Sequence, residues 1–136
     1  MNLVLRHTAG ILIFELDGHL DFEIARQVRD AYLQHLNQAQ VGMVFNLQKL
    51  KFVGSSGIHQ FIQFVKGEYQ KPTRPALCEA SREYIRLLRA YQSMRRPFLL
   101  FPTEHDAVQH FLQSQPAPFA VPENRLLKRL RLVSAT

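Results

Sequence analysis

The sequence predicts one α/β domain, with four helices packed against a mixed, mostly parallel sheet of about five strands. Short apolar runs alternate with segments whose apolar residues recur at helical spacing. Helical segments join the later strands, which favours parallel pairing after an antiparallel opening pair. A chain of 136 residues, 46% of them apolar, can build a sizeable core, so no cofactor or metal is expected.

The first third of the chain predicts a β-hairpin followed by a helix. Residues 3–6 and 11–16 are apolar-rich runs separated by a polar stretch that contains a glycine. Asp17-Gly18 predicts a turn. Asp21 is placed to cap a helix that runs to about Asn37, since the apolar residues after it repeat every three and four positions.

The middle of the chain predicts a buried strand, a loop and an amphipathic helix. Residues 41–46 form a short apolar run bounded by polar residues, which is typical of a buried strand. Residues 48–53 are expected to be a loop. The helix is expected to begin around Gly54, and its inward face is Ile58, Phe61, Ile62 and Val65.

Two more strand–helix pairs complete the predicted domain, which spans residues 1–114. Residues 76–78 predict a short strand, and Ser81 can cap the helix after it. Residues 98–101 follow a proline, which favours an edge strand. Thr103 opens a capping box for the last helix.

Residues 115–136 are predicted to be a basic C-terminal tail. Four cations and one carboxylate give this segment half of the formal net charge of +6. Residues 123–133 could form a short amphipathic helix. Three interpretations stay open for it: a solvated segment, a helix that docks on this domain or a partner, and attachment to a membrane surface or nucleic acid.

The remaining charge is spread over more than a hundred residues, so direct nucleic-acid binding is not expected. The only cysteine, Cys78, and six scattered histidines show no metal-ligand spacing. The serines at 55 and 56 do not stand in a G-x-S-x-G nucleophile elbow, and no phosphate-binding loop is present, so we expect no enzymatic activity. Neither a signal peptide nor an apolar run of about 20 residues is found, which favours the cytoplasm.

The stretch Gly54-Ser55-Ser56-Gly57 is the strongest candidate for a functional site. One interpretation is purely structural, because serine is a preferred helix cap. The other is functional, because a helix N-terminus favours an anion, and a phosphate on a serine there would add nearly two negative charges.

Three stretches resemble the STAS domain family, named for sulfate transporters and anti-sigma-factor antagonists. They are L-D-G-H-L-D at 16–21, V-F-N-L at 44–47 and F-V-G-S-S-G-I at 52–58, and element order and spacing extend the likeness over residues 2–114. The resemblance implies a small sheet packed with helices. It also implies, for bacterial members, binding to other proteins.

The resemblance places the family's phosphorylated switch serine on Ser55, with Ser56 as the alternate. Gly54 stands where the family has aspartate, so we expect protein binding here more than phosphorylation. Asp21 matches the family's aspartate beside the serine loop. The implied partner-binding residues are Asp21, Gly54, Ser55, Ser56, Gly57, Ile58, His59 and Gln63.

The resemblance implies an anti-sigma-factor antagonist, whose partner is an anti-sigma factor that is also a serine kinase. The alternative is a constitutive STAS subunit of a lipid-type ABC transporter, in which the chain would meet the membrane only through its transporter partner.

Overall fold

The computed structural model describes residues 2–39, 41–52, 54–68, 74–92, 97–113 and 125–131, with the backbone alone at 52, 54–56 and 125–131. The strands are β1 (Asn2–Thr8), β2 (Ile11–Leu20), β3 (Gly42–Phe52), β4 (Ala76–Cys78), β5 (Leu99–Phe101) and β6 (Arg125–Arg131). The helices are α1 (Phe22–His35), α2 (Gly54–Glu68), α3 (Arg82–Tyr91) and α4 (Glu104–Gln113), with a 3-10 turn, η1 (Leu36–Gln38), after α1.

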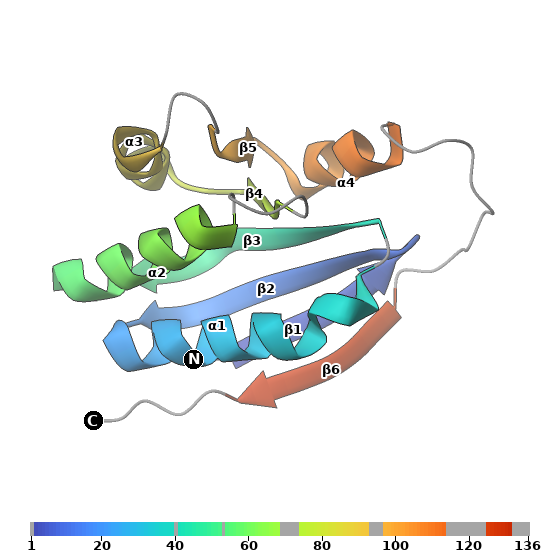
Figure 1. The fold of residues 1–136 in the computed structure, drawn as a ribbon, viewed down its shortest axis with the longest axis horizontal. Helices are drawn as coiled ribbons and strands as arrows, with labels where there is room; N and C mark the ends of the chain where they lie inside the picture. The colour runs from blue at the N-terminus through green and yellow to red at the C-terminus, as the bar shows by residue number, and fades with distance from the viewer. Residues whose placement is uncertain are drawn as a thin grey trace.

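The strands form one mixed sheet in the order β5-β4-β3-β2-β1-β6 (Figure 1). β2, β3, β4 and β5 are parallel neighbours, whereas β1 is antiparallel to both β2 and β6. Ala9 and Gly10 have positive φ angles of 50° and 83°, as the tight turn between β1 and β2 requires. The predicted α/β class, with a mostly parallel sheet and four helices, is confirmed.

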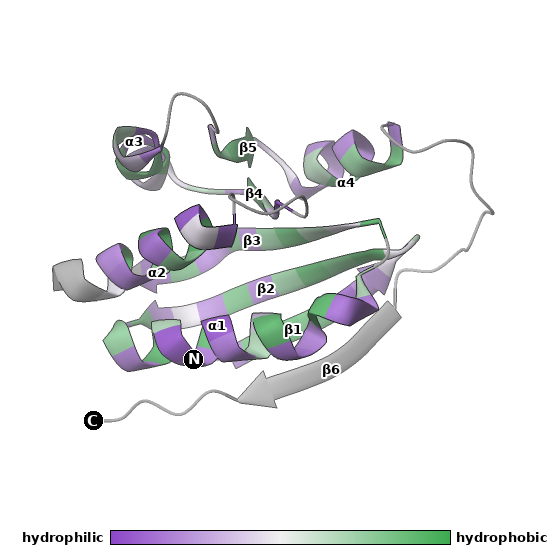
Figure 2. Cartoon of the chain, in the orientation of Figure 1, coloured by the Kyte–Doolittle hydropathy of each residue, from purple (hydrophilic) through white to green (hydrophobic). Residues whose placement is uncertain are grey.

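Two apolar cores lie on opposite faces of the sheet. The larger core joins the inward residues of β1, β2 and β3 to α1, α2 and α3, and it contains the aromatic rings of Phe14, Tyr32 and Phe45. The smaller core, around Ile13 and Val44, is covered by α4 through Ala107. β2 and β3 carry apolar residues for both faces, so much of their length is hydrophobic (Figure 2).

Two predicted connections are part of strands instead. Asp17-Gly18 was expected to be a turn, but both residues lie inside β2, where Gly18 has a φ of 129°. The prediction of a loop at 48–53 is wrong for residues 48–52, because these residues belong to β3, which ends at Phe52.

A β-bulge interrupts the pairing of β3 with β2 between Asn46 and Lys49. Glu15 pairs with Asn46 and Asp17 pairs with Lys49, so β3 holds one residue more than β2 in this interval. The extra residue turns both Leu47 and Leu50 into the core, although they are three positions apart. The side-chain oxygen of Asn46 accepts a hydrogen bond from the amide of Gln48 at 3.0 Å, which supplies the bulged backbone with a partner.

The C-terminal segment differs from its prediction. Residues 125–131, for which a short amphipathic helix was one possibility, form β6 and pair with β1 as a sixth strand. Apolar and basic residues alternate imperfectly in this segment. The pairing with β1 is correspondingly irregular: Leu5 pairs with Lys128 but Arg6 pairs with Leu126, so β6 has one extra residue at this point. Residues 114–124 lie outside the described part of the chain.

Candidate functional site

The start of α2 lies at the carboxyl edge of the parallel strands. β3 ends at Phe52 and α2 begins at Gly54, so Ser55 and Ser56 belong to the first turn of the helix. Their side chains lie outside what the structure describes. The amides of a first helical turn lack intrahelical acceptors, and no acidic residue stands in this turn, so it suits an anion.

The start of α1 lies at the same edge. Asp21 has extended backbone angles, and its Oδ1 accepts a hydrogen bond from the amide of Ile24 at 2.8 Å. The predicted N-cap is therefore confirmed. Glu23 adds a carboxylate in the first turn of α1, which the helix dipole favours.

Gly57 brings the two helix starts together. A Cβ atom at this position would lie 2.4 Å from the carbonyl oxygen of Leu20 and 3.1 Å from the Cα of Asp21. Any larger residue would push α2 away from the backbone that leads from β2 into α1. The first turn of α2 and Asp21 are therefore immediate neighbours.

The other predicted contact residues divide between two faces of α2. Ile58 is half-buried and packs against the larger core, so little of it is available to a partner. His59 and Gln63 are exposed and lie one turn apart on the outer face of the helix. The ring of His59 lies 6.4 Å from the ring of Tyr91 in α3, so the outer face of α2 continues onto α3.

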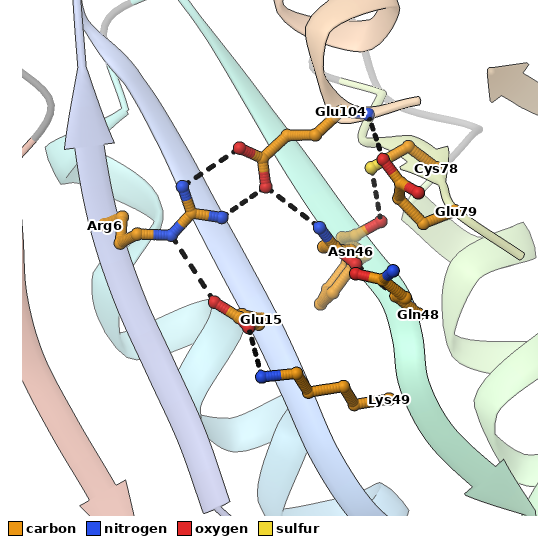
Figure 3. Close-up of polar contacts among 9 residues, drawn as sticks. Arg6, Glu15, Asn46, Gln48, Lys49, Cys78, Glu79 and Glu104 are labelled. Carbon is orange, nitrogen blue, oxygen red and sulfur yellow. Dashed lines mark hydrogen bonds and ion pairs between the residues drawn. The ribbon is translucent and has the colours of Figure 1, made fainter. Parts of the chain in front are cut away.

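A second polar cluster lies on the opposite face of the sheet, and it joins four elements (Figure 3). The guanidinium of Arg6 on β1 donates two hydrogen bonds to the carboxylate of Glu104 at the start of α4. Asn46 on β3 donates to the same carboxylate at 3.0 Å, and Glu79 accepts from the amide of Glu104 at 2.8 Å. Glu15 on β2 lies 3.5 Å from the Nε of Arg6.

This cluster holds charged groups in their ionised forms. Burial by itself raises the pKa of Glu104, but the hydrogen bonds from Arg6 and Asn46 outweigh it and keep that pKa below its usual value. The hydrogen bond to Glu104 likewise raises the pKa of Arg6. Nearby, burial raises the pKa of the Cys78 thiol to about 12, so Cys78 is a protonated core residue.

Sequence reasoning missed this cluster, because Arg6 and Glu104 stand 98 positions apart. The cluster fixes α4 to the sheet. The described residues include no group of histidine, cysteine and acidic side chains that could hold a metal ion.

The model of the STAS domain family matches residues 2–107. This chain belongs to the STAS domain family. No curated protein matches it. None of the helices in the described part of the chain combines the length and apolar character that a membrane crossing requires.

Solved structures share the fold at low sequence identity. The phosphorylated form of the Bacillus cell fate determinant SpoIIAA has 21% identity and a TM-score of 0.56, over 79% of this chain and 97% of that one. An anti-sigma factor antagonist from Mycobacterium paratuberculosis has 20% identity and a TM-score of 0.62, over 82% and 95%.

An anion transporter also contains this fold. The murine anion transporter Slc26a9 has 13% identity and a TM-score of 0.64, with 83% of this chain covered. This chain spans only 22% of the transporter, so the likeness concerns one domain of a much larger protein.

Two glycines of the same helix give a matched test of the helix contact. Replacing Gly57 with alanine should destabilise the fold by about 2 kcal/mol, since the new Cβ meets backbone that cannot move aside. Replacing Gly67 with alanine should stabilise it by up to about 1 kcal/mol, because no atom lies within 4 Å and alanine favours the helix. Urea unfolding of the two variants measures both values, and equal stabilisation by both would contradict the contact.

The Glu104 cluster predicts a pH-dependent stability difference. Glu104→Gln should lower the free energy of unfolding by about 2 kcal/mol at neutral pH, because Arg6 loses its main partner. The pKa of Glu104 is below its unfolded value, so its contribution is full above that unfolded value and is lost as pH falls through the folded pKa. The free energies of unfolding of wild type and Glu104→Gln should therefore approach the same value as the pH is lowered.

Lys49→Gln serves as the control for this comparison. Lys49 is 56% exposed and lies 3.6 Å from Glu15, so its loss should cost less than about 0.5 kcal/mol at any pH. A difference between wild type and Glu104→Gln that stays constant down to low pH would rule out the ionised carboxylate as the cause.

Proposed function

We propose that this chain is a non-enzymatic cytoplasmic regulator that binds another protein through the start of α2 and the neighbouring start of α1. The observation that carries the proposal is the close approach of Gly57 to Leu20 and Asp21, which joins the two helix starts into one surface. The surface comprises Asp21, Gly54, Ser55, Ser56, His59 and Gln63, with the buried Gly57 and the half-buried Ile58 beneath it.

A phosphate on Ser55 would act on this surface through charge. The first turn of α2 tolerates an anion, so phosphorylation leaves the fold intact. Its added charge of nearly −2 would stand on the first turn of α2, beside the start of α1, and would repel an acidic partner group. Ser55 is the first candidate for this modification and Ser56 is the alternate.

The fold supports a partner of the anti-sigma class. SpoIIAA has been solved in a phosphorylated form, and the mycobacterial structure is an anti-sigma factor antagonist. By analogy, the unmodified chain would bind an anti-sigma factor that is also a serine kinase, and that kinase would modify Ser55. Direct binding to nucleic acid forms no part of this function.

A second function is favoured by one feature of the site. Gly54 replaces the aspartate that precedes the family's switch serine, which fits a subunit that is never phosphorylated. Such a chain would be a constitutive STAS subunit of a lipid-type ABC transporter. It would meet the membrane only through that partner.

The proposed surface predicts that an acidic residue at Ser55 abolishes partner binding. Tagged wild type, Ser55→Ala and Ser55→Glu would be expressed in the native host and purified under identical conditions. Wild type and Ser55→Ala should retain an anti-sigma factor of the serine-kinase class, whereas Ser55→Glu should lose it because of its charge. Retention of the same partner by Ser55→Glu would contradict the switch.

Thr103→Asp is the matched control for this experiment. Thr103 caps α4 by accepting a hydrogen bond from the amide of Asp106 at 3.1 Å, and aspartate caps equally well. The variant adds the same charge at a different helix start, on the other face of the sheet. It should therefore bind the partner as wild type does.

Intact mass spectrometry of the chain from its own host tests the modification itself. A fraction heavier by one phosphate is expected, and this fraction should disappear in Ser55→Ala. An unmodified mass together with co-purification of a permease and its ATPase would contradict switching and support the transporter subunit.

A further inference from the structure

Three arginines form a stripe along α3. Arg82, Arg86 and Arg89 stand at i, i+4 and i+7, so they share one side of the helix. All three are exposed. Within the described part of the chain none of them forms an ion pair, whereas Arg6, Arg26 and Arg29 all do.

An apolar groove adjoins the stripe at Arg89. It has a volume of about 210 Å³ and lies between α3 and the carboxyl ends of β4 and β5. Apart from Arg89, its walls are apolar: Leu77, Ala80, Ile85, Leu100, Phe101 and Pro102.

The α3 stripe and groove are separate from the start of α2. Tyr91 stands nearly opposite the stripe on the helix, and its ring lies 6.4 Å from His59 of α2. The arginines therefore point away from α2. An occupant of this surface need not touch Ser55 or Asp21.

The size of the groove limits what it can hold. Sites for drug-sized ligands and cofactors span roughly 300–1,000 Å³. A groove of about 210 Å³ is smaller than this range and matches a single large apolar side chain. The three exposed arginines beside it add binding positions for carboxylates, because a guanidinium group can bind a carboxylate through two parallel hydrogen bonds.

We propose that the α3 stripe and groove bind an acidic segment of a partner protein, which places one apolar side chain in the groove and its carboxylates on Arg82, Arg86 and Arg89. An anionic membrane fits less well. Insertion into lipid needs protruding apolar side chains, whereas here the apolar surface is concave and Tyr91, 40% exposed, is the only large apolar residue that protrudes from α3. This proposal does not depend on the function of the α2 start.

Short fluorescein-labelled peptides test the proposal on the whole chain. Each carries three glutamates at i, i+4 and i+7 and one leucine, isoleucine or phenylalanine, and a matched set carries alanine at that position. Fluorescence anisotropy measures affinity. Amide chemical shifts of the ¹⁵N-labelled chain locate the peptide.

At least one apolar peptide should bind, with shifts centred on α3, β4 and β5, and its alanine counterpart should bind about tenfold more weakly. Arg86→Glu with Arg89→Glu should weaken binding at least about tenfold, because attraction becomes repulsion at two positions. Ala80→Leu should do the same by filling the groove. The matched control, Arg26→Glu with Arg29→Glu on α1, makes the same charge change and should alter affinity less than about twofold.

Three results would overturn the proposal. One is the absence of binding by every apolar peptide up to about 1 mM. Another is equal binding by the apolar and alanine peptides, which would indicate a non-specific attraction between charges. The third is binding to vesicles of phosphatidylglycerol and phosphatidylcholine without binding to any peptide, which would assign the arginines to a membrane surface.

Discussion

The first turn of α2 rests directly on the backbone that connects β2 to α1, and Gly57 makes this contact possible. A side chain at this position would collide with the carbonyl oxygen of Leu20. Because β2 and β3 are parallel neighbours, their carboxyl ends meet at one edge of the sheet and the helices that follow begin there. The candidate site lies where the ends of β2 and β3 meet, and Gly57 lets the helices that follow them start in direct contact.

The rest of the fold holds that edge in place. On one face, α1 and α2 pack over the aromatic core built around Phe14, Tyr32 and Phe45. On the other face, α4 is fixed by the ion pair between Arg6 and Glu104. Asn46 links α4 to the bulge in β3. Its side chain donates a hydrogen bond to Glu104 and accepts one from the backbone amide of Gln48. The bulge lets β3 keep both Leu47 and Leu50 in the core as it approaches the site.

The local features of this fold follow from short stretches of sequence. Asp21, Ser81 and Thr103 cap their helices as their positions predict, because capping needs only a side-chain oxygen and an amide two or three residues later. The strand at Ala76–Cys78 and the helix after Gly54 are equally local, since a run of apolar residues and their spacing define them.

The features that the sequence did not predict depend on distant residues. The bulge in β3 is defined by its pairing with β2, and β6 is defined by its pairing with β1, which is more than a hundred positions away in the sequence. The ion pair of Arg6 joins the first strand to the last helix. At the site, the motif identified Ser55 and Asp21. The need for glycine at position 57 comes from the carbonyl oxygen of Leu20, which only the fold brings against it.

The most direct test of the joined surface is an NMR titration of the ¹⁵N-labelled chain with the partner that co-purifies from its host. Perturbed amides should centre on the start of α1 at Asp21 and on the first two turns of α2, and Ser55→Glu should remove these perturbations. Binding that leaves both helix starts unperturbed would contradict the central claim that they form one protein-binding surface.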